Sequence, residues 1–262
     1  MKSMKTINSD EGYLVIITAC IDPSSGPAKV VRNDPLVRLE DYKHSLASWL
    51  SMADRRLQKI LFIENSGYPL DALNQLVSAS NPFNKQVEFV SLCCNNYPPD
   101  LHYGYAELNM IDEAFVTSKL LKESRYFIKA TGRLTFPQLP RLLNLLSEHY
   151  LFAVDCRKNS FLTRSAQVFV TTQLMLFSTL FYKQHLLNAK SELNKERTHI
   201  ENLLYEKLIP FEGQQGAILR WPVNVDPVGY AAHWHKKYDS SKQKAINLAR
   251  AICRVVFPNW WI

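Results

Sequence analysis

The chain has 262 residues, more than a typical domain of about 150 residues, and 47% of them are hydrophobic, which excludes a globally disordered protein. Lysine and arginine number 31 against 24 acidic residues, giving a net charge of +7. Most of this excess lies after Gly229, where six basic residues accompany one acid. A basic C-terminal segment favours an anionic partner, either a phospholipid surface or a nucleic acid.

The cysteines and the apolar runs of the sequence indicate the cellular compartment in which we expect the protein. Five cysteines without a CxxC pair argue against a disulfide framework or a zinc site and favour a reducing cytoplasm. The first 13 residues lack an apolar stretch, so we expect no signal peptide. The longest uncharged run, 165–182, contains several polar residues and is shorter than the ~20 apolar residues of a membrane span. We therefore read it as a buried strand that leads into a buried helix.

Short apolar runs alternate with amphipathic stretches over the first 157 residues. The runs rich in β-branched residues, which predict strands, are 13–21, 60–63, 87–92, 126–128 and 151–154. The amphipathic stretches, which predict helices, are 39–53, 70–78, 106–122 and 137–147. Continuous apolar strands between helices are typical of a parallel sheet that is covered on both faces. The predicted fold class is therefore α/β, with a Rossmann-like, mostly parallel sheet flanked by helices.

The pattern changes after residue 165. We expect a strand at 166–172 and then one long helix at 174–208, in which Leu186, Leu193 and Ile200 recur every seven residues. A helix packed along the domain is favoured over a coiled coil. The predicted organisation is one domain over 1–240, with the sheet at 1–165 and a more helical part at 166–240. A basic amphipathic segment, 241–262, follows it.

Polar and charged residues follow the predicted strands. Because ligands of open α/β sheets bind beyond the carboxyl ends of the strands, we expect these residues to line one crevice. Cations there suit a phosphate-bearing substrate, and carboxylates suit sugar hydroxyls or proton transfer. The candidate donor-binding residues are Asp22, Arg32, Arg38, Asn65, Lys129, Thr131, Gly132, Arg133 and Arg157. The candidate catalytic residues at these strand ends are Glu64 and Asp155.

Several motifs together resemble a group of bacterial glycosyltransferases that are encoded in surface-polysaccharide gene clusters (lipopolysaccharide O-antigen and capsule). The matching segments are ACID (19–22), DYxxSLxxWL (41–50), ILFIENSGYPLD (60–71), YGYAELNMIDEAF (103–115), YFIKATGR (126–133) and IENLLYEKL (200–208). The family's GEG-like element corresponds here to Tyr105-Ala106-Glu107, so that only Glu107 matches. The resemblance implies a GT-A-like fold and sugar transfer to a lipid-linked glycan at the inner face of the cytoplasmic membrane.

These observations and the resemblance predict a nucleotide-sugar-dependent glycosyltransferase, in which the sheet at 1–165 would bind the nucleotide sugar and 166–240 would form the acceptor side. Arg32, Arg38, Lys129 and Arg133 would neutralise the donor phosphates. Either Glu64 or Glu107 would act as base or bind sugar hydroxyls, and Asp155 would contact ribose, sugar or a metal. No DxD motif is present, so we expect no metal cofactor; the alternative is a manganese or magnesium ion held by Asp155. Two further readings stay open: a nucleotidyltransferase of sugar-precursor synthesis, and a non-catalytic peripheral membrane scaffold.

The C-terminal segment combines basic charge with an apolar stripe. Lysines and arginines of 242–254 accompany Ala245, Leu248, Ala249, Ile252 and Val256 on one helical face, and Phe257, Trp260, Trp261 and Ile262 follow. This pattern is typical of a helix that lies in a membrane interface. We expect the segment to bind an anionic membrane surface without crossing it; the alternative is docking on the protein's own core. No nucleic-acid motif is present, so we expect no nucleic-acid partner.

Overall fold

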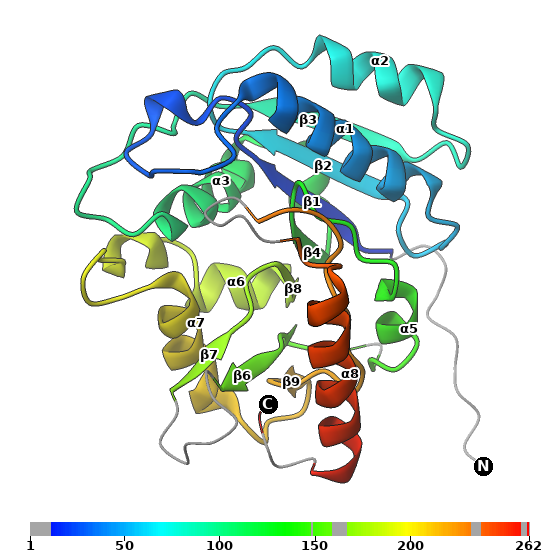
Figure 1. Ribbon diagram of the computed structural model, residues 1–262, viewed down its shortest axis with the longest axis vertical. Coiled ribbons are helices and arrows are strands. Elements are labelled where there is room, and N and C mark those ends of the chain that lie inside the picture. Colours follow the sequence, from blue (N-terminus) through cyan, green and yellow to red (C-terminus); the bar gives the residue numbers. More distant parts are fainter. Residues whose placement is uncertain (1–11, 148, 159–166, 232–236, 258–260, 262) are drawn as a thin grey trace.

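The computed structural model describes residues 12–147, 149–158, 167–231, 237–257 and 261. In this part of the chain the strands form a seven-stranded sheet of order β3-β2-β1-β4-β8-β5-β9 and a two-stranded sheet, β6-β7 (Figure 1). The strands are β1 Leu14–Ala19, β2 Lys59–Glu64, β3 Gln86–Ser91, β4 Tyr126–Thr131, β5 Phe152–Ala153, β6 Cys156–Lys158, β7 Val168–Val170, β8 Leu174–Ser178 and β9 Ala217–Ile218. The α-helices are α1 Pro35–Ser51, α2 Asp71–Ala79, α3 Gly104–Thr117, α4 Lys119–Lys122, α5 Leu139–Leu143, α6 Thr179–His185, α7 Ile200–Leu208 and α8 Ser241–Val256. Short 3₁₀ helices are η1 Pro23–Ser25, η2 Ala189–Glu192 and η3 Ile209–Phe211.

Four neighbouring strands, β3, β2, β1 and β4, are parallel. In their register Ile16 of β1 lies opposite Leu61 of β2 and Lys129 of β4. The next strand, β8, runs antiparallel to both β4 and β5. The predicted α/β class with a mostly parallel sheet is confirmed, and the five strands predicted before residue 157 are all found.

The sheet is buried on both faces, which explains its continuous apolar strands. Successive side chains of a strand point to opposite faces. Leu14 and Ile16 of β1 join the core that includes α3, α6 and α7. Val15 and Ile17 join the core formed with α1 and α5. All four are fully buried, so an apolar residue is favoured at every position of the strand rather than at alternate positions.

Helix α1 begins earlier than its apolar pattern predicted. Asp34 is the N-cap, and its carboxylate accepts hydrogen bonds from the backbone amides of Leu36 (2.8 Å) and Val37 (3.4 Å). Pro35 occupies the first helical position, where its missing N–H costs no helical hydrogen bond. The helix therefore starts at Pro35, four residues before the predicted Leu39.

The prediction of one long helix over 174–208 is wrong. Residues 174–178 form β8, whose Met175 lies opposite Lys129 of β4, and α6, η2 and α7 follow as separate elements. Asn188 has a left-handed backbone (φ 66°), so no helix continues through it. Leu186, Leu193 and Ile200 are all buried in one core, although they come from three different segments. Sheet hydrogen bonds in the centre of the fold overrode the helical pattern.

The predicted strand at 166–172 is found in part, as β7 (Val168–Val170), and it pairs with β6 outside the main sheet. Part of the uncharged run 165–182 lies outside the described residues, which omit 159–166. Within the described part of the chain, no helix is both long enough and apolar enough to cross a bilayer.

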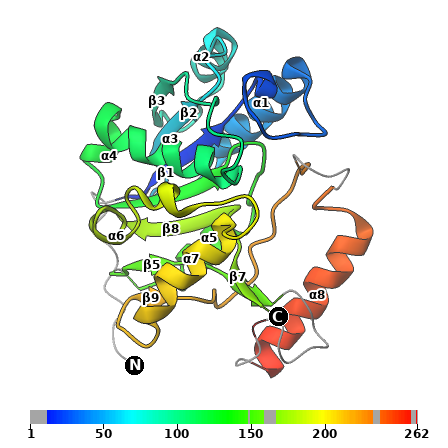
Figure 2. The same cartoon turned by 90° about the vertical axis from the view of Figure 1, so that its left-hand side faces the viewer.

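Helix α8 turns its polar side toward the protein. Gln243, Asn247 and Arg254 are buried, whereas the apolar stripe faces outward. Leu248 is 64% and Ile252 56% exposed. The stripe therefore does not dock on the protein's own core, and Figure 2 shows α8 at one side of the molecule, away from the β1–β4 strands.

The residues after α8 are described only in part. Trp261 packs edge-on against Tyr205 of α7, with ring centroids 6.2 Å apart, and joins the core rather than an outward surface. The predicted interfacial role of Trp260 and Ile262 concerns residues outside those described.

Candidate functional site

A cavity of about 220 Å³ opens at the carboxyl ends of β1, β2 and β4. We call it the donor pocket, after the role that the sequence predicts for the residues at these strand ends. Its lining combines strand-end residues with residues of α3, α7 and the loops near residue 230. Polar residues in this lining include Asn65, Asn95, Tyr103, Glu107, Thr131, Arg133, Gln173, Glu201, Tyr230 and Tyr238. Residues at or just beyond the ends of four of the predicted strands, Cys20, Asn65, Asn95 and Arg133, therefore meet at one cavity.

Glu107 enters this cavity from the first turn of α3 and is held by Lys129 of β4. The Lys129 ammonium is fully buried and donates to the Glu107 carboxylate, to the Thr172 carbonyl (2.6 Å) and to the Thr131 hydroxyl (3.3 Å). Burial lowers the pKa of Lys129, and the charge of Glu107 opposes that shift. Lys129 does not line the donor pocket, so its position does not fit the predicted contact with donor phosphate. Its ammonium instead holds the Glu107 carboxylate in place.

Glu201 is a second carboxylate in the donor pocket, and the sequence analysis did not select it. It lies in the first turn of α7, and its carboxylate accepts a hydrogen bond from the Tyr103 hydroxyl at 3.3 Å. Burial raises the pKa of Glu201, and the charge of Glu107 raises it further. The available signal was the IENLLYEKL segment, which contains Glu201, but the sequence analysis assigned that segment to a long helix.

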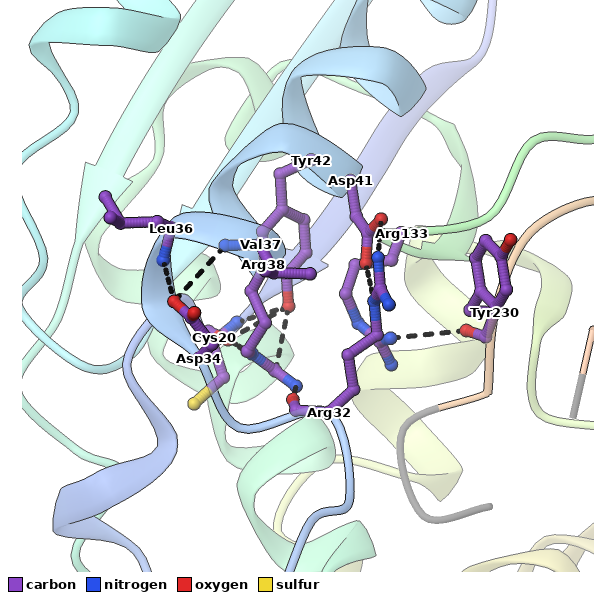
Figure 3. A network of polar contacts seen from close by, with 10 residues as sticks. All are labelled: Cys20, Arg32, Asp34, Leu36, Val37, Arg38, Asp41, Tyr42, Arg133 and Tyr230. Atoms are coloured by element: carbon purple, nitrogen blue, oxygen red, sulfur yellow. Dashed lines mark hydrogen bonds and ion pairs between the residues drawn. The ribbon is translucent and has the colours of Figure 1, made fainter. Parts of the chain in front are cut away.

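Arg133 and Asn65 bring hydrogen-bonding groups to the same cavity. The Arg133 guanidinium is mostly buried and donates to the Tyr230 carbonyl at 3.2 Å (Figure 3). The Asn65 side chain is 1% exposed, and neither its amide nitrogen nor its amide oxygen has a partner among the described residues. A buried amide without partners is costly, so a ligand group that both donates and accepts would satisfy it.

Two predicted phosphate ligands, Arg38 and Arg32, instead stabilise the loop after β1. The Arg38 guanidinium donates to the Cys20 carbonyl (2.7 Å), to the Arg32 carbonyl (2.9 Å) and to the Tyr42 hydroxyl (3.2 Å) (Figure 3). Arg32 forms a two-point ion pair with Asp41, which raises its pKa. Arg32 does not line the donor pocket, and Arg38 reaches its wall with most donors already used. Neither fits the predicted role of neutralising phosphate.

Glu64 does not fit the role of general base. It is fully buried, and its two oxygens accept hydrogen bonds from the backbone amides of Ile21 (2.9 Å), Ser66 (3.0 Å) and Tyr68 (3.1 Å). This carboxylate fastens the loop after β2 to the end of β1. Asp22 is likewise structural: it caps η1, and its hydrogen bonds with Ser24 lower its pKa.

Asp155 and Arg157 lie outside the donor pocket. The Asp155 carboxylate is fully buried and pairs with Arg157 (2.7 Å) and Arg254 (2.9 and 3.1 Å). Burial opposes ionisation, but the two arginines outweigh it and hold the pKa of Asp155 below its usual range. The predicted contact of Asp155 with ribose, sugar or metal does not fit this position. Arg157 lines a neighbouring cavity.

Thr131 lines the donor pocket, whereas Gly132 supports the turn behind it. A Cβ at Gly132 would lie 2.5 Å from the Thr18 carbonyl oxygen and 2.8 Å from the Tyr42 ring, so glycine is required by packing against β1 and not by a ligand. Cys20 also lines the pocket, but burial raises the pKa of its thiol to about 12, which keeps it protonated and a poor nucleophile.

Few side chains of the described residues are grouped so that they could ligate a metal ion. Among the described residues, no three histidine, cysteine, aspartate or glutamate side chains come together in a way that could hold an ion. Glu107 and Glu201 are the carboxylates in the donor-pocket lining, and one of them is already ion-paired with Lys129. The residues present therefore do not form a ready-made divalent-cation site.

Comparisons with known proteins find some similar solved structures but no matching family. No protein-family model matches the chain, and a search of curated proteins also finds no match. Similar solved structures include the inositol-1-phosphate CTP transferase of T. maritima, at 15% identity over 80% of this chain and 84% of that chain, with a TM-score of 0.46. A cytidylyltransferase of Leptospira borgpetersenii is 11% identical over 94% and 88%, with a TM-score of 0.45. Mouse xyloside xylosyltransferase 1 is 11% identical over 78% and 82%, with a TM-score of 0.41. All three identities are below 25% and all three TM-scores are below 0.5, so these likenesses assign no family and no activity to the chain.

Proposed function

We propose that the protein is a glycosyltransferase that moves a sugar from a nucleotide-activated donor to a glycan acceptor. The observation that carries this proposal is the donor pocket itself, in which two carboxylates, Glu107 and Glu201, share one cavity with Arg133 and the unpartnered amide of Asn65. Carboxylates suit sugar hydroxyls and proton transfer, and a buried guanidinium suits a diphosphate. The position beyond the carboxyl ends of parallel strands is where such sheets bind ligands.

The two carboxylates would divide the work according to their surroundings. Glu201, with its raised pKa, would accept the proton of the acceptor hydroxyl as that oxygen bonds to the anomeric carbon of the sugar. The bond from this carbon to the diphosphate oxygen breaks, and a nucleoside diphosphate leaves. Glu107, already paired with Lys129, would accept hydrogen bonds from sugar hydroxyls. Arg133 would neutralise the diphosphate, and Asn65 would pair with the nucleoside.

The wall built by the loop after β1 favours glycosyl over nucleotidyl transfer. A nucleotidyltransferase needs cations in this loop to bind a triphosphate. Here the loop contributes Pro23, Gly26, Ala28 and Val30 to the pocket, none of which is charged, and Lys29 is exposed. The nucleotidyltransferase alternative therefore lacks its phosphate-binding loop on this wall.

We further propose that donor phosphate is neutralised without a metal ion. Arg133 supplies a cation that would stabilise the leaving diphosphate directly. Transfer should then persist in excess EDTA. Complete loss of transfer in EDTA, with recovery on adding manganese or magnesium, would contradict this assignment.

We also propose that α8 attaches the enzyme to the cytoplasmic face of a membrane, where a lipid-linked acceptor in surface-polysaccharide synthesis would lie. The outward face of α8 is apolar, with Val255 81% exposed, and the exposed Lys242 and Lys244 lie beside it. This charge complements an anionic bilayer, to which each basic residue adds about 1 kcal/mol of binding. The buried polar face of the helix keeps it packed on the protein meanwhile.

A flotation experiment tests the membrane proposal. Leu248→Ser should weaken binding of the folded protein to vesicles of phosphatidylcholine and phosphatidylglycerol. Leu180 of α6 is a matched control because it has the same 64% exposure, and Leu180→Ser should leave flotation unchanged. Equal flotation of both variants and the unmodified protein would contradict attachment through α8.

A panel of nucleotide sugars tests the reaction itself. Thermal shifts with UDP, GDP, CMP and TDP sugars should identify the donor, and Asn65→Leu and Arg133→Gln should each abolish the shift. The control Arg55→Gln changes an exposed arginine in the turn before β2 and should retain the shift. Diphosphate release from a nucleoside triphosphate and a sugar 1-phosphate, without hydrolysis or transfer of any nucleotide sugar, would establish nucleotidyl transfer instead.

A further inference from the structure

A second cavity, of about 190 Å³, lies between the inward face of α8 and the β6–β7 sheet. We call it the α8 pocket. Arg157 of β6 and Arg250 of α8 line it, together with the buried amide side chains of Gln243 and Asn247. These groups offer hydrogen-bond donors from both sides of the cavity, which is the chemistry that binds an oxyanion.

The surroundings of the α8 pocket carry an excess of positive charge. Arg157 and Arg254 share the single carboxylate of Asp155, and Arg220 and Arg250 lie close enough to interact electrostatically with the same group. The pocket lining adds one further acid, Asp226. Four arginines therefore face two aspartates.

Two of these arginines have buried side-chain nitrogens without hydrogen-bond partners among the described residues. The three side-chain nitrogens of Arg220 are buried and have no partner among the described residues, and Nε of Arg250 is in the same condition. Arg250 otherwise makes one long contact, 3.5 Å, with the Asn247 amide oxygen. Burial lowers the pKa of Arg250, and the nearby charge of Arg157 lowers it further. Such an arrangement is strained by like charges and is relieved by an anion.

The lone acid in the described lining does not cancel this excess. Burial raises the pKa of Asp226, and Arg157 and Arg250 oppose that shift. The buried Asp155 is already taken by two arginines and by the backbone amide of Trp221 at 3.4 Å. An incoming anion would therefore meet Arg157 and Arg250 with donors available.

The α8 pocket borders the donor pocket. Gln173 and Tyr238 line both cavities, and Tyr238 is close enough to Arg133 and Glu201 for their charges to affect its pKa. We infer that the α8 pocket binds the phosphate or diphosphate group of the acceptor and so places the acceptor hydroxyl beside Glu201. This inference rests on the proposed glycosyltransferase function, and it assigns the acceptor's anionic end to Arg157 and Arg250. The outward apolar face of α8 would hold the lipid chain of the same acceptor at the membrane.

Inorganic diphosphate tests the anion site without any nucleotide present. We expect it to raise the melting temperature of the full chain and to bind in calorimetry. Arg250→Gln should weaken this binding about tenfold or more, since it removes a charge-assisted contact. Without diphosphate, the same variant should melt at the unmodified temperature or above, because it removes like-charge repulsion. Arg55→Gln, the exposed control with the same charge change, should bind diphosphate normally.

A second experiment, with lipid vesicles, distinguishes a lipid-linked diphosphate from free diphosphate as the ligand of the α8 pocket. Phosphatidylcholine vesicles that contain a polyprenyl diphosphate should float more protein than plain phosphatidylcholine vesicles, and free diphosphate should compete with that increment. Arg250→Gln should lose the increment. If free diphosphate binds through Arg250 but the lipid adds nothing, the assignment to a lipid-linked acceptor is overturned.

Two further outcomes would overturn the inference or detach it from the proposed function. Equal diphosphate binding by the Arg250→Gln and Arg55→Gln variants would show general charge attraction and no site. Loss of nucleotide-sugar binding in Arg250→Gln would make the α8 pocket part of the donor site. Conversely, if no nucleotide sugar binds the unmodified protein while Arg250-dependent binding of the polyprenyl diphosphate persists, the proposed function fails and the anion site stands.

Discussion

The buried ion pair between Lys129 and Glu107 allows a quantitative test of how the donor pocket is built. Replacing Glu107 by glutamine leaves the Lys129 ammonium buried, with the Thr172 carbonyl and the Thr131 hydroxyl as its remaining oxygens. Replacing Lys129 by methionine removes the buried charge and leaves the Glu107 carboxylate, which is 19% exposed, in partial contact with water. The two single changes therefore differ in which charge they leave unpaired.

The surroundings of Lys129 and Glu107 determine how much each substitution should lower the free energy of unfolding. Breaking a buried ion pair from one side costs about 3–5 kcal/mol. Glu107→Gln should cost less, about 2 kcal/mol, because the amide oxygen can still accept from Lys129 and two neutral oxygens remain. Lys129→Met should cost about 1–2 kcal/mol, because the exposed carboxylate is partly hydrated. The double variant leaves no unpaired charge, so it should be at least 1 kcal/mol more stable than the sum of the singles predicts.

Urea unfolding followed by tryptophan fluorescence gives the free energy of unfolding of the unmodified protein, of the two single variants and of the double variant. Additive single effects would refute the conclusion that the two side chains form one buried unit. A functional readout adds a second check: Lys129→Met should lower kcat while changing donor Kd less than Arg133→Gln does, because Lys129 lies outside the pocket lining. A loss of donor affinity as large as that of Arg133→Gln would return Lys129 to direct phosphate contact.

Three other changes test separate features of the molecule. Glu201→Gln should lower kcat by about 10²–10⁴-fold and remove the acidic limb of the pH–rate profile, since a base with a raised pKa loses activity on protonation as pH falls; an unchanged limb would exclude it as base. Gly132→Ala should lower the free energy of unfolding by roughly 1–3 kcal/mol because its Cβ would meet the Thr18 carbonyl. If the variant is as stable in urea as the unmodified protein, the backbone of β1 can shift to accommodate the added methyl group. Burial lowers the pKa of Lys85 from 10.5 to about 8, so the unfolded chain binds more protons between these values, and the stability of the unmodified protein relative to Lys85→Met should rise as pH increases through that window. A flat difference across the window would show that Lys85 titrates normally.

The fold was largely predictable from sequence because its first half obeys local rules. The runs that became β1, β2 and β4 are mostly apolar and buried, as a sheet covered on both faces requires, whereas β3 is a partly exposed edge strand. The helices between them follow from a 3.6-residue period. From this alternation alone, the meeting of strand ends at one edge could be expected, and Asn65, Thr131 and Arg133 indeed line the donor pocket; Glu107 of α3, which the family resemblance suggested, lines it too.

The second half of the chain was misread where tertiary pairing overrides local preference. Nothing within residues 174–178 shows that they lie between β4 and β5, because that position depends on pairing with β4, 44–52 residues earlier in the chain, and with β5, 23–25 residues earlier. The heptad spacing of Leu186, Leu193 and Ile200 reflects a shared core rather than a shared helix. Glu201 was overlooked for the same reason, since only the break before α7 turns it toward Glu107.

Only the tertiary structure decided what each charged residue does. The sequence by itself determined which residues follow the strands, but charged side chains at strand ends look alike in one dimension. In three dimensions Glu64 is saturated by backbone amides and Asp155 by arginines, whereas Asn65 keeps an unpaired buried amide. For α8, composition revealed an amphipathic helix, but only packing showed that its polar face is turned inward, since that face has buried partners and the apolar face has none among the described residues.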